Sequence, residues 1–150
     1  YSIIINMSMK KIIGCGALFY NLQTKRFLFL HRTQSKQSNV WGLVGGTNIE
    51  SETPWESLKR EISEEVGSVD IVKTIPLETF VSNDENFLYH TYLCVVKQEF
   101  LPQLNEEHDG YAWVQFGKWP KPLHQGLRNT LQNRTNQIKL ETVFKMLKFL

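Results

Sequence analysis

Cysteine is scarce in this chain, and long apolar runs are missing. The two cysteines, Cys15 and Cys94, lie in separate apolar stretches without paired spacing, and the four histidines form no ligand cluster. This pattern disfavours a disulfide framework and a zinc site. No segment has the roughly 20 continuous apolar residues that a membrane-spanning helix needs. We therefore expect no membrane association, a reducing compartment and a cytoplasmic location.

An excess of charge of either sign is also missing. The sequence has 17 basic and 15 acidic residues, which gives a formal net charge of +2, and the basic residues are scattered along the chain. The pattern indicates no dedicated nucleic-acid surface, whereas a polyanionic small molecule remains a plausible partner. The sequence leaves a homodimer open.

Length and composition indicate one domain. With 150 residues and 41% hydrophobic content, the chain can form one sizeable core, so we expect a single domain over residues 1–150. No internal repeat or low-complexity tract is present in the sequence. The apolar start is too short for a secretory signal and lacks a basic leading region, so residues 1–8 are interpreted as leader or added sequence.

The most informative stretch runs from Gly46 to Gly67 and reads GTNIESETPWESLKREISEEVG. Its Thr53-Pro54 pair predicts a helix start, because threonine can cap the free amide of Glu56 and proline suits the first helical position. The glutamate can in turn reach back to the capping residue. Gly67 predicts the end of the same helix.

Projection of this helix at about 100° per residue separates two stripes. The stripe expected to face the core holds Trp55, Leu58, Ile62 and Val66. The neighbouring stripe holds Ser57, Glu61, Glu64 and Glu65. Carboxylates three and four residues apart repel by roughly a few tenths of a kcal/mol per pair, and a divalent cation would remove that repulsion. Oxygen ligands suit Mg²⁺ or Mn²⁺. The alternative is a solvent-exposed, glutamate-rich helix, which leaves the capping residues, the preceding glycine pair and the terminal glycine unexplained.

The same stretch fits the pattern G-x5-E-x7-R-E-I-x-E-E-x-G and resembles the signature of the Nudix hydrolases. Every charged or glycine position is filled, and the departure is Ser68, where the family usually has an aliphatic residue. The resemblance implies an α/β fold, namely the Nudix-type α/β/α sandwich with a mixed β-sheet. It also implies a metal-dependent hydrolase that cleaves the pyrophosphate linkage of nucleoside diphosphate derivatives, such as nucleotide sugars, dinucleotides or nucleoside triphosphates.

The resemblance also assigns roles to residues. Glu64 and Glu65 are the expected principal metal ligands, and Glu61 is a ligand or the base for the attacking water. The carbonyl of Gly45 is expected as a further ligand, in a tight turn that needs unusual φ and ψ values. An ordinary turn is the alternative there. Arg60 is expected to hold one of these carboxylates through a two-pronged salt bridge.

A second segment, residues 105–113, reads NEEHDGYAW and resembles the E-H-x-x-Y-x-W segment of many family members. In several of them an acidic residue of this loop is a further metal ligand or the general base, for which Glu107 is the first choice here and Glu106 the second. An exposed acidic loop that ends in a core tryptophan is the alternative. His108 is interpreted as a hydrogen-bonding scaffold.

Other candidates lie outside these two segments. Arg32 and Lys36 could contact substrate phosphates, and Glu52 is expected to brace the motif loop or its arginine. Four aromatic residues could stack on a base but are expected in the core, because aromatics at strand spacing usually lie there: Phe19, Phe80, Tyr89 and Tyr111.

The remaining pattern predicts a sheet flanked by helices. The β-rich runs are 12–20, 26–31, 40–44, 69–77, 87–96 and 111–115, and the first two read as a hairpin. After Pro122 the apolar spacing becomes helical and predicts a C-terminal helix. One apolar face holds Leu123, Leu127 and Leu131, and another holds Val143, Met146, Leu147 and Leu150. The motif helix and this helix would cover both faces of the sheet.

Three functions remain open at this point. The first is the metal-dependent hydrolase. The second is a catalytically idle domain that binds a nucleotide as a sensor, and the third is a relative that releases a sugar from a GDP-sugar. The complete set of glutamates favours the first.

Overall fold

The structure, a computed structural model, describes residues 11–33 and 38–149. Its seven-stranded sheet has the order β3-β2-β1-β6-β5, with β4 paired to β1 and β7 paired to β2. The strands are β1 (Ile12–Asn21), β2 (Arg26–Arg32), β3 (Trp41–Gly42), β4 (Val44–Thr47), β5 (Lys73–Val81), β6 (Phe87–Val96) and β7 (His108–Gln115). The helices are α2 (Pro54–Val66), α3 (Gln125–Gln132) and α4 (Arg134–Leu147). The β1–β6 pair is parallel and the other pairs are antiparallel, so the predicted mixed sheet is confirmed.

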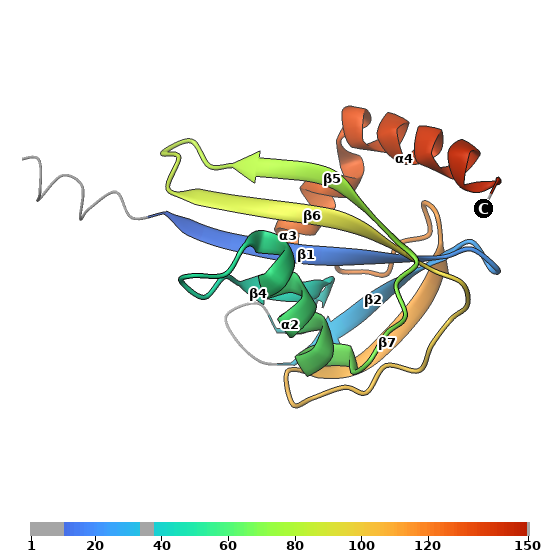
Figure 1. The fold of residues 1–150 in the computed structure, drawn as a ribbon, viewed down its shortest axis with the longest axis horizontal. Coiled ribbons are helices and arrows are strands. Elements are labelled where there is room, and N and C mark those ends of the chain that lie inside the picture. Colours follow the sequence, from blue (N-terminus) through green and yellow to red (C-terminus); the bar gives the residue numbers. More distant parts are fainter. Residues whose placement is uncertain (1–10, 34–37, 150) are drawn as a thin grey trace, which may run out of the picture.

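Strand β1 lies at the centre of the sheet and brings β4 into place. It pairs with β6 along its full length of ten residues. On its other side, β1 pairs with β2 near its end, where Tyr20 lies opposite Phe27. Residues 14–17 pair instead with residues 44–47 of β4. The segment just before the motif helix therefore becomes a sheet strand, and α2 lies across it and β1 (Figure 1).

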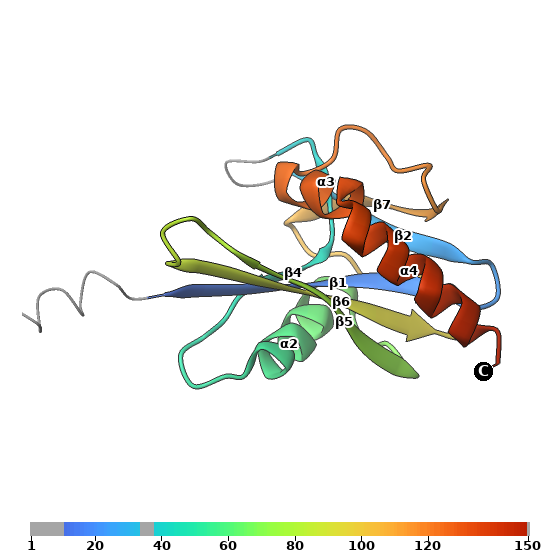
Figure 2. The same ribbon diagram turned by 90° about the horizontal axis from the view of Figure 1, so that it is seen from above.

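The sheet has α2 on one face and α3 and α4 on the other (Figure 2). Alternate residues of β1 point to the two sides, so Cys15, Ala17 and Phe19 join the core beneath α2 while Leu18 and Tyr20 join the core beneath α3 and α4. Because both faces of the sheet are covered, the central strands are apolar throughout. The predicted α/β/α sandwich is confirmed.

The predicted elements differ from the observed ones in four places. The run 40–44 is divided between two short strands, β3 and β4, and β4 continues to Thr47. The run 69–77 becomes a strand only from Lys73, because Val69 and Ile71 pack against the α2-side core. The last strand begins at His108, earlier than predicted. The single predicted C-terminal helix is two helices, because Asn133 ends α3 and its side chain caps α4 by accepting a hydrogen bond from the amide of Asn136 at 3.1 Å.

The helical apolar faces are confirmed in part. Leu127 and Leu131 of α3 are buried, and Leu147 of α4 is buried with Val143 packed against the same core. Met146 is 66% exposed, so its predicted place on the buried face is wrong, and Leu150 lies outside the described residues. Within residues 11–33 and 38–149, no helix is long and apolar enough to cross a membrane.

Candidate active site

Helix α2 has the predicted start and end. The hydroxyl of Thr53 accepts a hydrogen bond from the amide of Glu56 at 3.2 Å, and the Glu56 carboxylate accepts one from the amide of Thr53 at 3.0 Å. Gly67 ends the helix with φ +90°, a conformation that side chains other than glycine disfavour. Leu58 and Ile62 are buried as predicted. The caps thus fix where α2 begins and ends, and its buried residues fix which side faces the sheet.

The three carboxylates of the polar stripe have different environments. The side chain of Glu64 is 55% exposed, that of Glu61 is 14% exposed and that of Glu65 is 2% exposed. Glu65 belongs to the turn of α2 that lies against β4, where the amide of Gly45 donates a hydrogen bond to its Oε1 at 3.3 Å. Only tertiary packing distinguishes these three glutamates, which are adjacent on the helix projection.

The two glycines before the motif are strand residues, so the predicted tight turn with unusual φ and ψ values is wrong. Gly45 lies opposite Gly16 and Gly46 opposite Cys15 in the β4–β1 ladder, and neither has a positive φ. A Cβ on Gly45 would overlap the carbonyl oxygen of Cys15, and one on Gly46 would lie 2.5 Å from Oε1 of Glu61. Glycine is needed at position 45 because the backbone of β1 is close, and at position 46 because the carboxylate of Glu61 is close.

Glu65 is a buried carboxylate with an incomplete set of partners. Its Oε1 accepts from Gly45, but its Oε2 is buried and has no hydrogen-bond partner among the described residues. Burial raises the pKa of Glu65 well above its ordinary value of 4.5, and the neighbouring Glu61 raises this pKa further. A buried, unpaired carboxylate is costly. A cation at this position would remove both the desolvation cost and the repulsion from Glu61.

The loop that leads into β7 supplies two groups to the same place. Ligand atoms of Glu65, Glu107 and His108 all lie within 4.8 Å of one another, and Nε2 of His108 is 4.0 Å from Oε1 of Glu65. Glu107 is exposed, whereas His108 is 7% exposed. Burial, with a further contribution from the charge of Arg32, lowers the pKa of His108 to about 4. His108 is therefore neutral at pH 7, with a nitrogen lone pair available for an ion or a proton.

Arg60 ties the polar face of α2 together. Its two-pronged salt bridge goes to Glu52, through Nε at 3.0 Å and Nη2 at 3.2 Å, and not to one of the three helix glutamates as predicted. Its Nη1 lies 3.1 Å from Glu61 and 3.4 Å from Glu64. Glu52 also accepts a hydrogen bond from the amide of Ile49 at 3.1 Å, so this carboxylate contacts both the loop and the arginine. These contacts raise the pKa of Arg60 above its already high ordinary value.

The NUDIX domain model matches residues 10–133 of this chain. The chain belongs to the NUDIX family. It is 31% identical to dihydroneopterin triphosphate diphosphatase from Haemophilus influenzae over 113 residues, which cover 65% of this chain and 70% of that protein. Its fold is similar to a MutT NUDIX hydrolase from Burkholderia pseudomallei, with a TM-score of 0.69 and 25% identity over 83% of this chain and 98% of that one. RenU, a Nudix hydrolase from M. smegmatis, has a TM-score of 0.68 and 20% identity over 89% of this chain and 87% of that chain. The chain is a Nudix pyrophosphohydrolase.

One residue of this Nudix site, Asn105, lies outside the motif and was not predicted from the sequence. Asn105 joins the loop to α2, because its Nδ2 donates to the carbonyl of Glu64 at 3.2 Å and its Oδ1 accepts from the amide of Glu107 at 3.0 Å. The side chain of Glu106 lies outside the Glu65–Glu107–His108 group, and its carbonyl accepts a hydrogen bond from Thr33 at 3.1 Å. Asn105 thus sets where Glu107 lies relative to α2.

The structure describes only some of the residues that were expected to contact the phosphates or the base of a substrate. Arg32 lies at the end of β2, opposite His108 in the β7 ladder. Burial lowers the pKa of His108 and of His124, and the charge of Arg32 lowers both further. Lys36 lies outside the described residues. Of the aromatic candidates, Phe19 is buried as expected. Phe80 is 49% exposed and Tyr111 is 40% exposed, so their assignment to the core is wrong. Tyr89 covers Gly14 and Gly16 of β1.

Proposed function

We propose that this Nudix enzyme is a divalent-metal-dependent hydrolase that cleaves the pyrophosphate linkage of nucleoside diphosphate derivatives, including nucleotide sugars, dinucleotides and nucleoside triphosphates. The observation that carries the proposal is the buried, unpartnered oxygen of Glu65, which lies in one group with Glu107 and His108. A buried carboxylate oxygen without a partner is costly, and a bound cation would remove this cost.

The residues present fit a hard divalent cation. Glu61, Glu64 and Glu65 on α2, together with the carbonyl of Gly45, would hold it, and carboxylate and carbonyl oxygens suit Mg²⁺ or Mn²⁺. When bound, the ion supplies charge neutralisation for the diphosphate and lowers the pKa of a coordinated water. The nitrogen of His108 is 4.0 Å from Glu65 and adds a softer donor, which Mn²⁺ accepts more readily than Mg²⁺.

The other proposed site residues have separate roles: one positions the carboxylates, one acts as the base and two bind phosphates. Arg60 holds Glu61 and Glu64 at 3.1 and 3.4 Å and so keeps their oxygens turned to one side of the helix. Glu107 would accept the proton of an attacking water, and its exposure and its closeness to Glu65 support this role. Glu61 is the second choice for that base, because its carboxylate is already paired with Arg60. Arg32 and the sequence-based candidate Lys36 would contact the substrate phosphates.

The relatives guide the choice of substrates to test. The 31% identical relative is named a dihydroneopterin triphosphate diphosphatase, so a pterin triphosphate is included as a specific candidate for this chain. The Nudix domain of Shewanella oneidensis NrtR, solved with ADP ribose, is 14% identical and supports the fold alone. The sensor and the sugar-releasing alternatives are less well supported, because Glu61, Glu64 and Glu65 are all present in the motif.

The proposal is tested by a substrate panel assayed in ¹⁸O-labelled water with Mg²⁺ or Mn²⁺. We expect hydrolysis at a phosphoanhydride bond, with one solvent oxygen in a phosphate of the products. Label on a sugar carbon would establish the sugar-releasing reaction instead. Tight nucleotide binding without product from any compound of the panel would establish the sensor. The Glu65→Gln variant, assayed beside the wild type, should lose turnover by at least a hundredfold.

We further propose that residues 1–150 act as one domain in the cytoplasm. Cys15 and Cys94 are both free and buried, which fits a reducing compartment. A homodimer stays a prediction that size-exclusion chromatography with light scattering would test.

A further inference from the structure

Helix α4 has two apolar stripes, and the core of the protein uses only one of them. The buried stripe packs beneath the helix and consists of Leu140, Val143, Phe144 and Leu147. The outer stripe consists of Ile138, Met146 and Phe149, which are 50%, 66% and 90% exposed. Phe149 lies in the turn after α4, where Lys148 keeps helical φ and ψ values. At about 100° per residue, the outer stripe falls within about a quarter of the helix circumference. Single exposed apolar residues are common, but a contiguous stripe indicates a surface for a partner.

Cations border the outer stripe along one side. In the same projection Arg134, Lys145 and Lys148 follow each other there, and we call these three residues the basic border. All three are exposed, and none of them forms a salt bridge within the part of the chain that the structure describes. Glu141 is the one carboxylate among them. On the other side, Nζ of Lys139 donates to a backbone carbonyl of β5 at 3.0 Å. The outer face of α4 is therefore apolar with a positive margin.

The charges of the protein are divided between the two faces of the sheet. Residues 116–149, which form α3, α4 and the loop before them, include seven lysines or arginines and one carboxylate. Residues 48–66, which form α2 and the loop before it, include six carboxylates and two cations. These two layers cover opposite faces (Figure 2). The cations are scattered along the sequence, and the fold collects many of them on the side of α4. This side attracts anionic surfaces.

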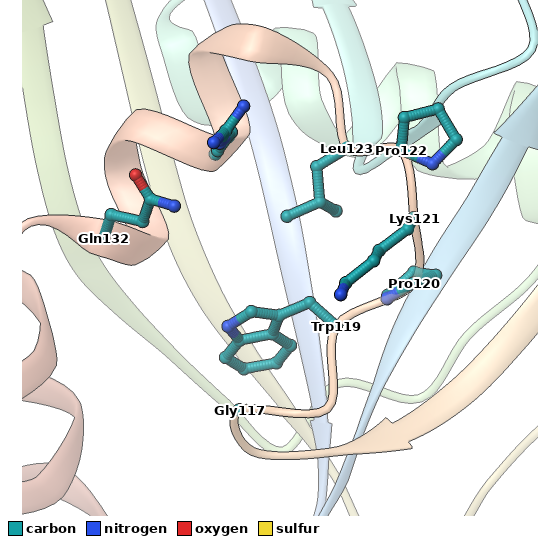
Figure 3. A pocket seen from close by; sticks show the side chains of 8 residues that line it. Gly117, Trp119, Pro120, Lys121, Pro122, Leu123 and Gln132 are labelled. Atoms are coloured by element: carbon teal, nitrogen blue, oxygen red, sulfur yellow. The ribbon is translucent and has the colours of Figure 1, made fainter.

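Two of these cations belong to a different feature. Lys121 and Arg128 line a cavity of about 530 Å³ between α3 and the loop before it (Figure 3). A ligand in that cavity would use them, so they are not counted with the outer stripe. Arg134, Lys145 and Lys148 do not line the cavity. The basic border is therefore available to a partner that covers α4.

We propose that the outer stripe and the basic border form a docking surface for an anionic lipid bilayer. The apolar side chains enter the boundary between headgroups and acyl chains, and the cations contact the lipid phosphates. The expectation of no membrane association rested on the lack of a spanning segment, and contact through a surface helix needs none. The helix that carries the motif glutamates lies on the opposite face of the sheet, so docking leaves α2 uncovered.

Two other occupants fit this surface less well. A second copy that docks through the same stripe would bring two basic borders together, and like charges repel. A nucleic acid would use the cations for its phosphates but would leave the apolar side chains without a contact. The bilayer uses both features. The proposal does not depend on the reaction proposed for the carboxylate site.

The test measures binding of the full chain to vesicles by co-sedimentation. Vesicles of phosphatidylcholine alone are compared with vesicles that also contain phosphatidylserine. The wild type should bind the anionic vesicles roughly tenfold or more tightly, and added salt should weaken this binding. Lys145→Gln should weaken it about fivefold, because one cation no longer contacts the anionic surface. Met146→Ser should weaken it by roughly the same factor, because a polar side chain does not enter the bilayer.

Each variant has a matched control on another part of the protein. Lys59→Gln removes an exposed lysine from α2, and Leu101→Ser removes a 74% exposed leucine from the loop before β7. Both controls should bind the anionic vesicles as the wild type does. Lys145→Gln and Met146→Ser should keep the wild-type melting temperature and the wild-type kcat on a soluble substrate, because both side chains are exposed and lie outside the proposed site.

Four results would overturn the proposal. The first is equal binding to both kinds of vesicle, or to neither. The second is an equal loss of binding in Lys59→Gln, which would show attraction by net charge alone. The third is binding of a double-stranded oligonucleotide that Lys145→Gln weakens and Met146→Ser does not, with vesicle binding likewise unchanged in Met146→Ser, which would assign the surface to nucleic acid. The fourth is a wild type that dimerises without vesicles and a Met146→Ser variant that stays monomeric in light scattering, which would assign the outer stripe to a contact between copies.

Discussion

Replacement of Glu65 by glutamine should stabilise the metal-free protein at alkaline pH. Burial and the adjacent Glu61 raise the pKa of Glu65, so the folded state binds its proton more tightly than the unfolded state does. Wild-type stability must then fall as pH rises above the ordinary value of 4.5. Glutamine keeps the oxygen that accepts from Gly45 and does not titrate. The free energy of unfolding of Glu65→Gln should therefore exceed that of the wild type by an amount that grows with pH.

The size of this effect follows from the burial of the carboxyl. Each pH unit between the ordinary and the raised pKa corresponds to about 1.4 kcal/mol, so the ceiling at pH 8 is about 5 kcal/mol. Side-chain relaxation and water entry reduce this ceiling, as they do for most buried charges. We expect a gain of at least ~1 kcal/mol at pH 8, which raises the melting temperature of a domain of this size by about 2 to 4 °C. Below pH 4.5 the two proteins should differ little.

The assay is urea unfolding in EDTA at intervals from pH 5 to pH 9, for the wild type, Glu65→Gln and Glu64→Gln. Glu64 is the matched control, because it lies one residue away but is 55% exposed and paired with Arg60, so its replacement should change the stability only slightly. Because the pKa of His108 is lowered, its contribution to the free energy of unfolding is lost as pH falls from 6.5 toward 4. This loss is common to all three proteins. The reasoning is refuted if Glu65→Gln is destabilised throughout, or if its pH profile matches that of Glu64→Gln.

Further predictions concern the backbone, the loop and the ion. Gly45→Ala should lower the melting temperature by more than 10 °C or prevent folding, because the added Cβ overlaps the carbonyl of Cys15. Gly42→Ala should change it by only a few degrees in the same thermal scans, because its Cβ would lie 3.5 Å from the side-chain Cδ of Arg32. Asn105→Ala should lower kcat at least tenfold and displace the acidic limb of the pH–rate profile, because it releases the loop that carries Glu107 and a general base acts only when deprotonated. An unchanged profile would assign Asn105 to stability alone. Mg²⁺ or Mn²⁺ should raise the melting temperature of the apo protein by mass action, and stoichiometric zinc in the purified protein would contradict the oxygen-ligand argument.

The sequence by itself determined the local features of the motif helix α2. Thr53, Pro54, Glu56 and Gly67 fix where α2 begins and ends through contacts within a few residues, so a pattern in the chain is sufficient to predict them. The bounds of strand β6 also match its apolar run in the sequence. The α/β/α layers were predictable as well, because apolar spacing indicates which elements must cover a sheet. The break between α3 and α4 depends on the cap formed by Asn133, a short polar signal within an otherwise continuous helical pattern.

Only the tertiary structure decided which carboxylate is the buried one and what surrounds it. Glu61, Glu64 and Glu65 are equivalent on a helical projection, and the position of β4 against α2 is what buries Glu65 and leaves Glu64 in solvent. The approach of His108 depends on a β2–β7 ladder between segments about 75 residues apart in sequence. Contacts of this kind arise from strand pairing and packing over long sequence separations, and therefore no local pattern in the chain records them.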